Sequence, residues 1–334
     1  MRPISGIWVP LITPFQDGEI DLASYRNLVE HYIGLGVSGL FPLGTTGEAP
    51  TLDDGEIDVI LKETAAAVAG RVPVFIGVGG NATRKVAAAV ERLGRQDVDG
   101  IVSVCPYYNR PGQDGLRDHF AAIAGATDRP VMIYNIPYRT AVNLENDTLL
   151  ELAELPNIVG VKDSSGDLAQ SLDLLARRPE GFAVLTGEDA MIYTMLANGG
   201  DGGILASSHL ATETFVEIDR RMAANDHPGR AGPLAASGAA RLDAVPRGQP
   251  DADQVLPVAP GIDRVAGMPA AADRRVGGPG AGSRPLAGDG NRPVPGYVIA
   301  LISSWLRLPG TTMIGTGSWP DRRELRPLTS GPRP

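Results

Sequence analysis

The chain of 334 residues contains one cysteine, Cys105, and few aromatic residues, which make up 5% of the sequence. A single cysteine excludes an internal disulfide and any metal site built from several cysteines, and it fits a reducing compartment. The four histidines are scattered and show no metal-ligand spacing. The residues themselves therefore predict no metal site.

Positive charge is also scarce. Lysine and arginine together number 30 against 39 acidic residues, the net charge is −9, and no basic cluster occurs. This balance argues against nucleic acid and anionic membrane surfaces as partners, but it leaves room for a small acid at a local cationic site. Residues 1–10 lack the apolar core of a signal peptide, and the apolar run 297–306 is about half the length that spans a bilayer. We expect a cytoplasmic protein.

Lysine is rare even among the cations, with three lysines against 27 arginines. One of them, Lys162, ends the apolar run 158–162, Ile-Val-Gly-Val-Lys. Arginine stays protonated, whereas a desolvated lysine amine loses its proton and becomes a nucleophile. Lys162 is therefore a candidate Schiff-base residue, and the alternative is a strand-end lysine that reaches solvent. Lys62 and Lys85 lie in amphipathic helix patterns and are interpreted as solvated charges.

Short β-type runs alternate with helical patterns at intervals of roughly 28 residues. The predicted strands are 7–12, 39–43, 73–78, 100–105, 130–134, 158–162, 183–186 and 203–206. The predicted helices are 22–35, 54–69, 83–93, 116–126, 146–155, 168–177 and 190–197. Continuous apolar strands are typical of parallel sheets buried on both faces, so the pattern predicts an α/β fold, a (β/α)8 TIM barrel. The alternative is a doubly wound open sheet, but no complete dinucleotide fingerprint follows the glycine-rich segment 77–80.

In such a barrel the chemistry belongs at the carboxyl ends of the strands. Polar side chains follow four of the predicted strands, in segments 44–48, 105–110, 134–140 and 162–167. These segments bring hydroxyls, phenols, a guanidinium and the Lys162 amine to one rim of the barrel.

Each polar group has a functional and an ordinary interpretation. Thr45 and Thr46 lie between glycines, where hydroxyls and exposed amides could hold a carboxylate, or they form a plain turn. Tyr134 could relay protons to an imine, or it is a core tyrosine. Arg139 could clamp a carboxylate, or it is an exposed loop charge. Cys105 has no histidine base nearby and is interpreted as a buried hydrophobe.

These segments resemble the dihydrodipicolinate synthase and N-acetylneuraminate lyase superfamily of class I aldolases. The matching motifs occur in family order and at family spacing from residue 4 to about 226. They are Gly-Thr-Thr-Gly-Glu at 44–48, Pro-Tyr-Tyr-Asn-Arg-Pro at 106–111, Tyr-Asn-Ile-Pro at 134–137 with Arg-Thr at 139–140, and Gly-Val-Lys at 160–162. Within the superfamily they are most similar to the synthases.

The resemblance implies a Lys162 imine with pyruvate, whose enamine attacks L-aspartate 4-semialdehyde in lysine and diaminopimelate biosynthesis. It implies that no metal or organic cofactor is needed. Thr45 and Tyr108 would complete a proton relay with Tyr134, and Tyr108 would reach into a neighbouring subunit, giving a homodimer or homotetramer. The pyruvate and aldehyde contacts that the resemblance implies are Thr46, the backbone at Gly187 and Ile204, and Arg139.

Two departures from the family's sequence pattern leave the identity of the aldehyde substrate open. After the lysine the synthases commonly carry Glu-Ala-Thr-Gly, whereas residues 163–167 read Asp-Ser-Ser-Gly-Asp, a pattern more familiar in keto-acid aldolases and dehydratases. Ala141 stands where the family usually has glycine. The alternatives are therefore an aldolase or dehydratase of another 2-oxo acid with the same Schiff base, or an inactive barrel that binds a 2-oxo acid.

From His227 the composition changes to Pro, Gly, Ala, Arg and Asp with little periodicity, which predicts a poorly ordered region over 227–334 beside a catalytic barrel over 1–226. The codons possible for 248–254, read one nucleotide later, permit Gly-Asn-Pro-Thr-Pro-Ile-Lys, and the family carries Asn-Pro-x-Pro-Ile/Val-Lys there. Our hypothesis is a frameshift near 226–230 that replaces the last barrel helix and the C-terminal helices.

Overall fold

The computed structural model describes residues 4–226. Eight parallel strands form one sheet in the order β4-β1-β10-β9-β8-β7-β6-β5. Their bounds are β1 Gly6–Val9, β4 Gly39–Leu40, β5 Phe75–Gly77, β6 Gly100–Val104, β7 Val131–Asn135, β8 Ile158–Asp163, β9 Ala183–Thr186 and β10 Gly202–Ile204. The two ends of this order meet where Leu40 forms a parallel bridge with Val74. The sheet is therefore a nearly closed barrel, which confirms the predicted TIM barrel.

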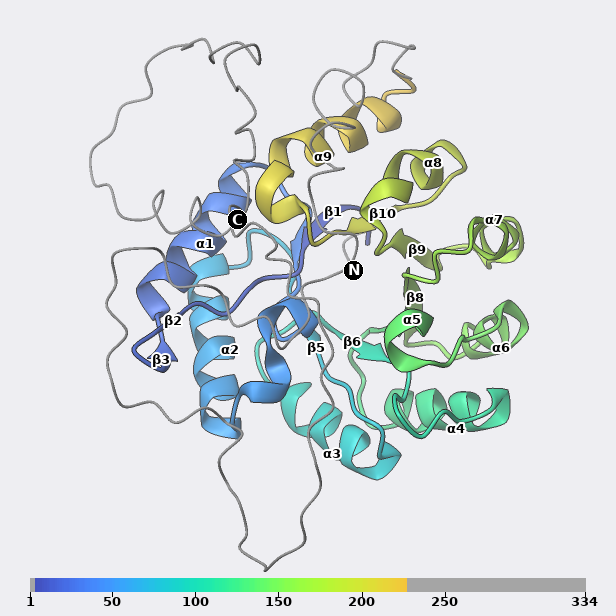
Figure 1. The fold of residues 1–334 in the computed structure, drawn as a ribbon, viewed down its shortest axis with the longest axis horizontal. Coiled ribbons are helices and arrows are strands. Elements are labelled where there is room, and N and C mark those ends of the chain that lie inside the picture. Colours follow the sequence, from blue (N-terminus) through green and yellow to red (C-terminus); the bar gives the residue numbers. More distant parts are fainter. Residues whose placement is uncertain (1–3, 227–334) are drawn as a thin grey trace, which may run out of the picture. The chain divides into compact units, whose positions relative to one another are not determined.

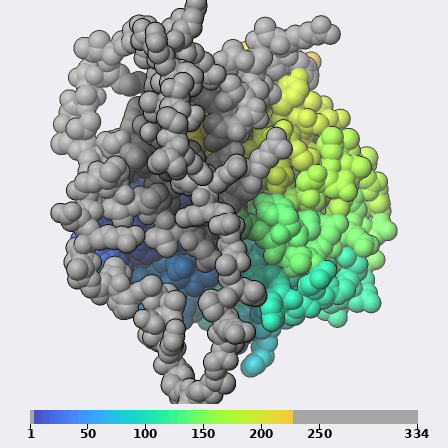
Figure 2. Space-filling model, in the orientation of Figure 1, coloured from blue at the N-terminus to red at the C-terminus, as the bar shows by residue number. Residues whose placement is uncertain are grey.

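Figure 1 shows the helices as an outer ring around the strands. The barrel helices are α1 Leu22–Gly34, α2 Asp54–Val68, α3 Thr83–Leu93, α4 Gln113–Ala124, α6 Asn146–Leu152, α7 Leu168–Arg177, α8 Ile192–Ala197 and α9 Ser208–Ala223. Shorter elements lie in the connections: strands β2 Phe15–Gln16 and β3 Glu19–Ile20, helix α5 Pro137–Thr140, and 3-10 turns at Thr45–Gly47, Ala49–Thr51 and Asp189–Met191. In the same orientation, Figure 2 shows the part of the ring from α4 to α8 in space-filling form, coloured turquoise to yellow.

The eighth barrel helix corrects one expectation. Helix α9 follows β10 directly, so the last helix of the barrel lies before residue 226 and is not lost to the proposed frameshift. Ala211 has non-helical angles and kinks the first turn of α9. The other predictions for residues 227–334 concern the frameshift, poor order and the apolar run 297–306. These residues lie outside the part of the chain that the structure describes.

Large and small side chains alternate to fill the barrel interior. Trp8 and Phe75 meet edge to face with ring centroids 5.2 Å apart. A Cβ on Gly39 would lie 2.4 Å from the Trp8 ring, and one on Gly100 would lie 2.5 Å from the Phe75 ring. Glycine at these two strand positions therefore makes room for the rings. A second apolar layer, between strands and helices, holds the helix ring in place.

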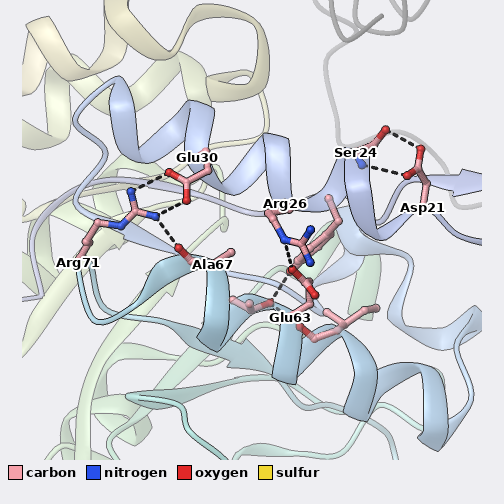
Figure 3. Close-up of polar contacts among 10 residues, drawn as sticks. Asp21, Ser24, Arg26, Glu30, Glu63, Ala67 and Arg71 are labelled. Atoms are coloured by element: carbon pink, nitrogen blue, oxygen red, sulfur yellow. Dashed lines mark hydrogen bonds and ion pairs between the residues drawn. The ribbon is translucent and has the colours of Figure 1, made fainter.

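Helices α1 and α2 show how neighbouring helices are joined (Figure 3). The Arg71 guanidinium donates to both carboxylate oxygens of Glu30, at 2.6 and 2.8 Å, and Arg26 donates to Glu63 at 2.6 Å. Such exposed pairs contribute at most about 1 kcal/mol each. Asp21 caps α1 by accepting from the Ser24 N–H at 3.0 Å. Among residues 4–226, no helix is long and apolar enough to span a membrane.

Candidate active site

Lys162 lies inside the barrel at the carboxyl end of β8. Its side chain has 0% relative exposure, and in the register of β7 and β8 it stands opposite Tyr134. The amine Nζ is 4.2 Å from the centroid of the Tyr134 ring and 5.3 Å from that of Phe41. Within the described residues Nζ has no hydrogen-bond partner. The interpretation as a solvated strand-end lysine is therefore wrong.

This environment changes the charge of the amine. Burial lowers the pKa of Lys162 to about 7, although the nearby Asp189 and Glu188 carboxylates favour the charged form. The Arg139 guanidinium acts in the same direction as burial. The lowered pKa makes the neutral amine available near neutral pH, and a neutral amine can attack a carbonyl.

Three buried hydroxyls lie at the carboxyl ends of the strands, and one of them, that of Ser164, acts on another, that of Tyr134, as a hydrogen-bond partner. They belong to Tyr134, Thr46 and Ser164, and all three residues are buried. Burial raises the pKa of the Tyr134 phenol, so it stays protonated at neutral pH. Such hydroxyls have hydrogen-bonding capacity left for a bound molecule.

The Thr45-Thr46 turn is positioned by the neighbouring strand exit. Thr13, which follows β1, donates from Oγ1 to the Gly47 carbonyl at 2.7 Å. A Cβ on Gly47 would lie 2.8 Å from the Leu11 carbonyl, so glycine lets the turn pack against that chain. Thr46 is buried and Thr45 half-buried, and the predicted Thr pair does reach the rim.

Gly187 follows β9, and Ile204 is the last residue of β10. A Cβ on Gly187, just after β9, would lie 2.0 Å from Ser164 Oγ and 2.8 Å from Lys162 Cε. Only glycine fits there, beside the reactive side chain. Ile204 ends β10 and is buried in the same interior cluster as Tyr134.

Arg139 lies in α5, directly after the exit of β7. Its guanidinium carbon is 5.9 Å from the centroid of the Tyr138 ring. The α5 loop is held by Asn135 at the end of β7, whose side chain donates to Asn143 Oδ1 at 2.8 Å and accepts from the Leu144 N–H at 3.0 Å. Arg139 is half-buried, and its charge acts on both Lys162 and Tyr134.

Tyr108 is the one predicted site residue that is turned outward. Its side chain is 90% exposed, and its backbone has a positive φ of 72°. The structure of the single chain therefore does not bring Tyr108 to Tyr134.

The sequence-based analysis missed two carboxylates. Glu188 and Asp189 follow Gly187 at the exit of β9, and both act electrostatically on Lys162. Asp189 accepts from the Ser207 N–H at 3.2 Å, whereas Glu188 Oε1 is buried without a hydrogen-bond partner among residues 4–226. Their position after a predicted strand was the available signal, the same one that marked the other exits.

The structure also separates Asp163 and Ser164, two of the three changes after the lysine. Asp163 is the last residue of β8, and its carboxylate accepts from Ser171 Oγ of α7 at 2.5 Å and from the Ser165 N–H at 2.9 Å. Ser164 faces Gly187 and Lys162 instead. Of these two residues, only Ser164 adds a polar atom on the Lys162 side.

A buried, partly neutral lysine among hydroxyls at the carboxyl end of a parallel barrel defines an imine-forming enzyme of the class I aldolase type. Among the described residues, no group of three or more potential metal-ligating side chains occurs.

Comparison with known proteins identifies the family. A family model described as the dihydrodipicolinate synthetase family matches residues 3–229. The 4-hydroxy-tetrahydrodipicolinate synthase 2 of Clostridium acetobutylicum is 51% identical over 224 residues, which are 67% of this chain and 78% of that protein. The synthase of Koribacter versatilis is 44% identical over 225 residues, covering 67% and 75%. The chain belongs to the dihydrodipicolinate synthetase family.

Solved structures agree. Dihydrodipicolinate synthase from Aquifex aeolicus superposes with a TM-score of 0.65 and 37% identity, covering 67% of this chain and 76% of that chain. A structure described as the first monomeric dihydrodipicolinate synthase variant gives a TM-score of 0.67 at 34% identity, covering 71% and 79%.

Proposed function

We propose that this chain is a 4-hydroxy-tetrahydrodipicolinate synthase that condenses pyruvate with L-aspartate 4-semialdehyde. The observation that carries the proposal is the fully buried Lys162 amine, with a pKa near 7 and the Tyr134 phenol beside it. Relatives of that name at 40–51% identity support the choice of substrates.

The reaction begins with attack of the neutral Lys162 amine on the ketone carbon of pyruvate. Loss of water from the carbinolamine gives an imine, and loss of a methyl proton gives an enamine. Tyr134 donates and accepts these protons in this proposal, which the distance of 4.2 Å between the Lys162 amine and the centroid of the Tyr134 ring supports. Thr46 and the backbone at Gly187 and Ile204 hold the pyruvate carboxylate in this proposal.

The enamine carbon then attacks the aldehyde, and the new oxyanion takes a proton. The amino group of the former semialdehyde adds to the imine carbon and displaces Lys162, which closes the ring and regenerates the amine. Arg139 holds the carboxylate of the semialdehyde, because a guanidinium forms two parallel hydrogen bonds with a carboxylate.

The exposure of Tyr108 supports an oligomer. A phenol that is 90% exposed on a rim loop is available to a second copy of the chain. We propose a homodimer or homotetramer in which Tyr108 of one copy joins Thr45 and Tyr134 of another as the proton relay. A cytoplasmic location, with neither nucleic acid nor membrane as partner, belongs to the same proposal.

Ser164 favours a second candidate function. Its hydroxyl stands beside Lys162 where the synthases commonly carry alanine, and a hydroxyl there can accept or donate a hydrogen bond to a hydroxylated 2-oxo acid. An aldolase or dehydratase of such an acid would use the same imine. The Ser164→Ala variant should lower activity on a hydroxylated 2-oxo acid about tenfold or more and leave the pyruvate adduct in place.

Borohydride trapping tests the proposal. Incubation with pyruvate and borohydride should give a stable adduct at Lys162, located by peptide mass spectrometry, and Lys162→Arg should give none. A folded protein without this adduct would be an inactive barrel instead. Coupled assays with L-aspartate 4-semialdehyde and with other aldehydes then separate the synthase from the second candidate.

A further inference from the structure

Three neighbouring strands carry the charges around the amine. Strand β8 with Lys162 lies between β7 and β9 in the sheet. Arg139 follows the exit of β7, and Glu188 follows the exit of β9. A molecule bound over Lys162 therefore meets a cation on one side and an anion on the other.

Glu188 has an unused carboxylate oxygen. Oε1 is buried and has no hydrogen-bond partner in the described part of the chain, while the Glu188 N–H donates to Thr186 Oγ1 at 3.0 Å and fixes the backbone. Burial raises the pKa of Glu188, and Asp189 and Asp163 add to the rise. A half-buried carboxylate among other acids is stabilised by a cation that reaches it.

The Lys162 amine is not this cation. Its Nζ makes no hydrogen bond to Glu188, and the nitrogen is neutral once it forms part of an enamine. The buried Lys162 amine lies 4.2 Å from the centroid of the Tyr134 ring, and the Glu188 carboxylate acts electrostatically on both side chains. These observations indicate that a bound molecule meets all three.

We propose that Glu188 is a specificity-determining residue that binds the α-ammonium group of the aldehyde substrate, opposite the carboxylate held by Arg139. The inference rests on the proposed function and extends it to the recognition of the α-amino acid group of the substrate. L-aspartate 4-semialdehyde carries carboxylate and ammonium on one carbon, which matches a cation and an anion placed on the two flanking strands. An aldehyde without the ammonium leaves the Glu188 carboxylate unpaired and is disfavoured.

Two aldehydes that differ only at this group test the proposal. The Glu188→Gln variant should lower kcat/KM for L-aspartate 4-semialdehyde about 10- to 100-fold, because a charge-assisted hydrogen bond is lost. The inhibition constant of succinic semialdehyde, which lacks the ammonium, should change less than about twofold. Arg139→Met should weaken both aldehydes. Glu180→Gln, an exposed position before the other end of β9, is the matched control and should change neither.

Equal losses for the two aldehydes in Glu188→Gln would overturn the proposal, because the carboxylate would then act through Lys162. So would no loss for either. Borohydride trapping of pyruvate in the same preparations separates these results from a failure of the proposed function. If the wild-type protein forms no adduct, the proposed synthase function is contradicted. If the adduct is normal and the Glu188→Gln variant keeps the aldehyde selectivity of the wild type, only the proposed role of Glu188 is contradicted.

Discussion

At the scale of single residues, the burial of Lys162 increases the reactivity of its amine and lowers the stability of the fold. Burial lowers its pKa from the ordinary 10.5 to about 7. A neutral amine is the nucleophile that imine formation needs, but a protonated amine in the same fully buried place is desolvated and has no hydrogen-bond partner among the described residues. The burial that activates Lys162 therefore weakens the fold whenever the amine is charged.

The rate of imine formation should follow the neutral amine. Below pH 7 we expect the second-order rate of pyruvate adduct formation to rise about tenfold per pH unit, and above pH 7 to level off. Stopped borohydride trapping between pH 5 and 9 measures this rate. A midpoint near 10 would show that Lys162 is not desolvated in solution.

Stability should change with pH in the opposite sense to a salt-bridged lysine. Because folding lowers the pKa of Lys162, the unfolded chain binds more protons than the folded chain between pH 7 and 10.5. The destabilisation caused by the buried charge is therefore complete below pH 7, and it disappears as the pH rises to 10.5. Lys162→Met should raise the free energy of unfolding by a few kcal/mol at pH 6, and this gain should shrink toward pH 10. Denaturant unfolding measures it, with Lys62→Met on the exposed face of α2 as the control.

At the scale of elements, the loops at the carboxyl ends of the strands carry left-handed residues that are not glycine. They include Leu43, Glu48, Tyr108, Arg110 and Ala141. Such conformations cost roughly 1–2 kcal/mol per residue and persist where the surrounding structure requires them. The rim that holds the site is thus more strained than the barrel beneath it.

Ala141 offers a test of that cost. It ends α5 with φ 59° and ψ 20°, which explains why the family usually has glycine there. Ala141→Gly should stabilise the protein by roughly 1 kcal/mol in thermal or denaturant unfolding. Ala153 ends α6 in the right-handed region, so Ala153→Gly should destabilise by up to about 1 kcal/mol. Changes of the same sign in both variants would contradict the argument.

At the scale of the whole molecule, the exposed Tyr108 connects one chain to another in our proposal. Tyr108→Phe and Lys162→Ala homo-oligomers should each lose most activity. After subunits are mixed and exchanged, some sites should combine an intact Lys162 with Tyr108 from the other variant, and partial activity should return. Mixed oligomers, shown by native mass spectrometry, that stay inactive would exclude relay across subunits.

The boundary near residue 226 also belongs to this scale. The matched family range ends at 229, close to the change in composition at His227. The frameshift remains a prediction, and the gene tests it: the coding sequence for 248–254, read one nucleotide later, should encode Asn-Pro-x-Pro-Ile/Val-Lys, with the displacement located between codons 226 and 230. Codons that do not permit that segment would end the hypothesis.

Much of the barrel could be predicted because its strands are buried on both faces and leave continuous apolar runs. All eight predicted strands overlap observed ones, and the Lys162 and Tyr134 exits were marked by polar residues that end such runs. The β2–β3 hairpin escaped prediction because its strands have two residues each, too few for a periodicity. Helix α9, Ser208–Ala223, was not among the predicted helices.

The sequence by itself determined the class of fold, the reactive amine and the family, since apolar spacing and motif order are local properties of the chain. Only the tertiary structure decided that Lys162 is fully buried, that Ser164 and Glu188 share its surroundings while Asp163 turns toward α7, and that Tyr108 points outward. The reason is physical: desolvation and the pairing of charges depend on which strand exits become neighbours when the sheet closes, and that closure joins residues far apart in the chain.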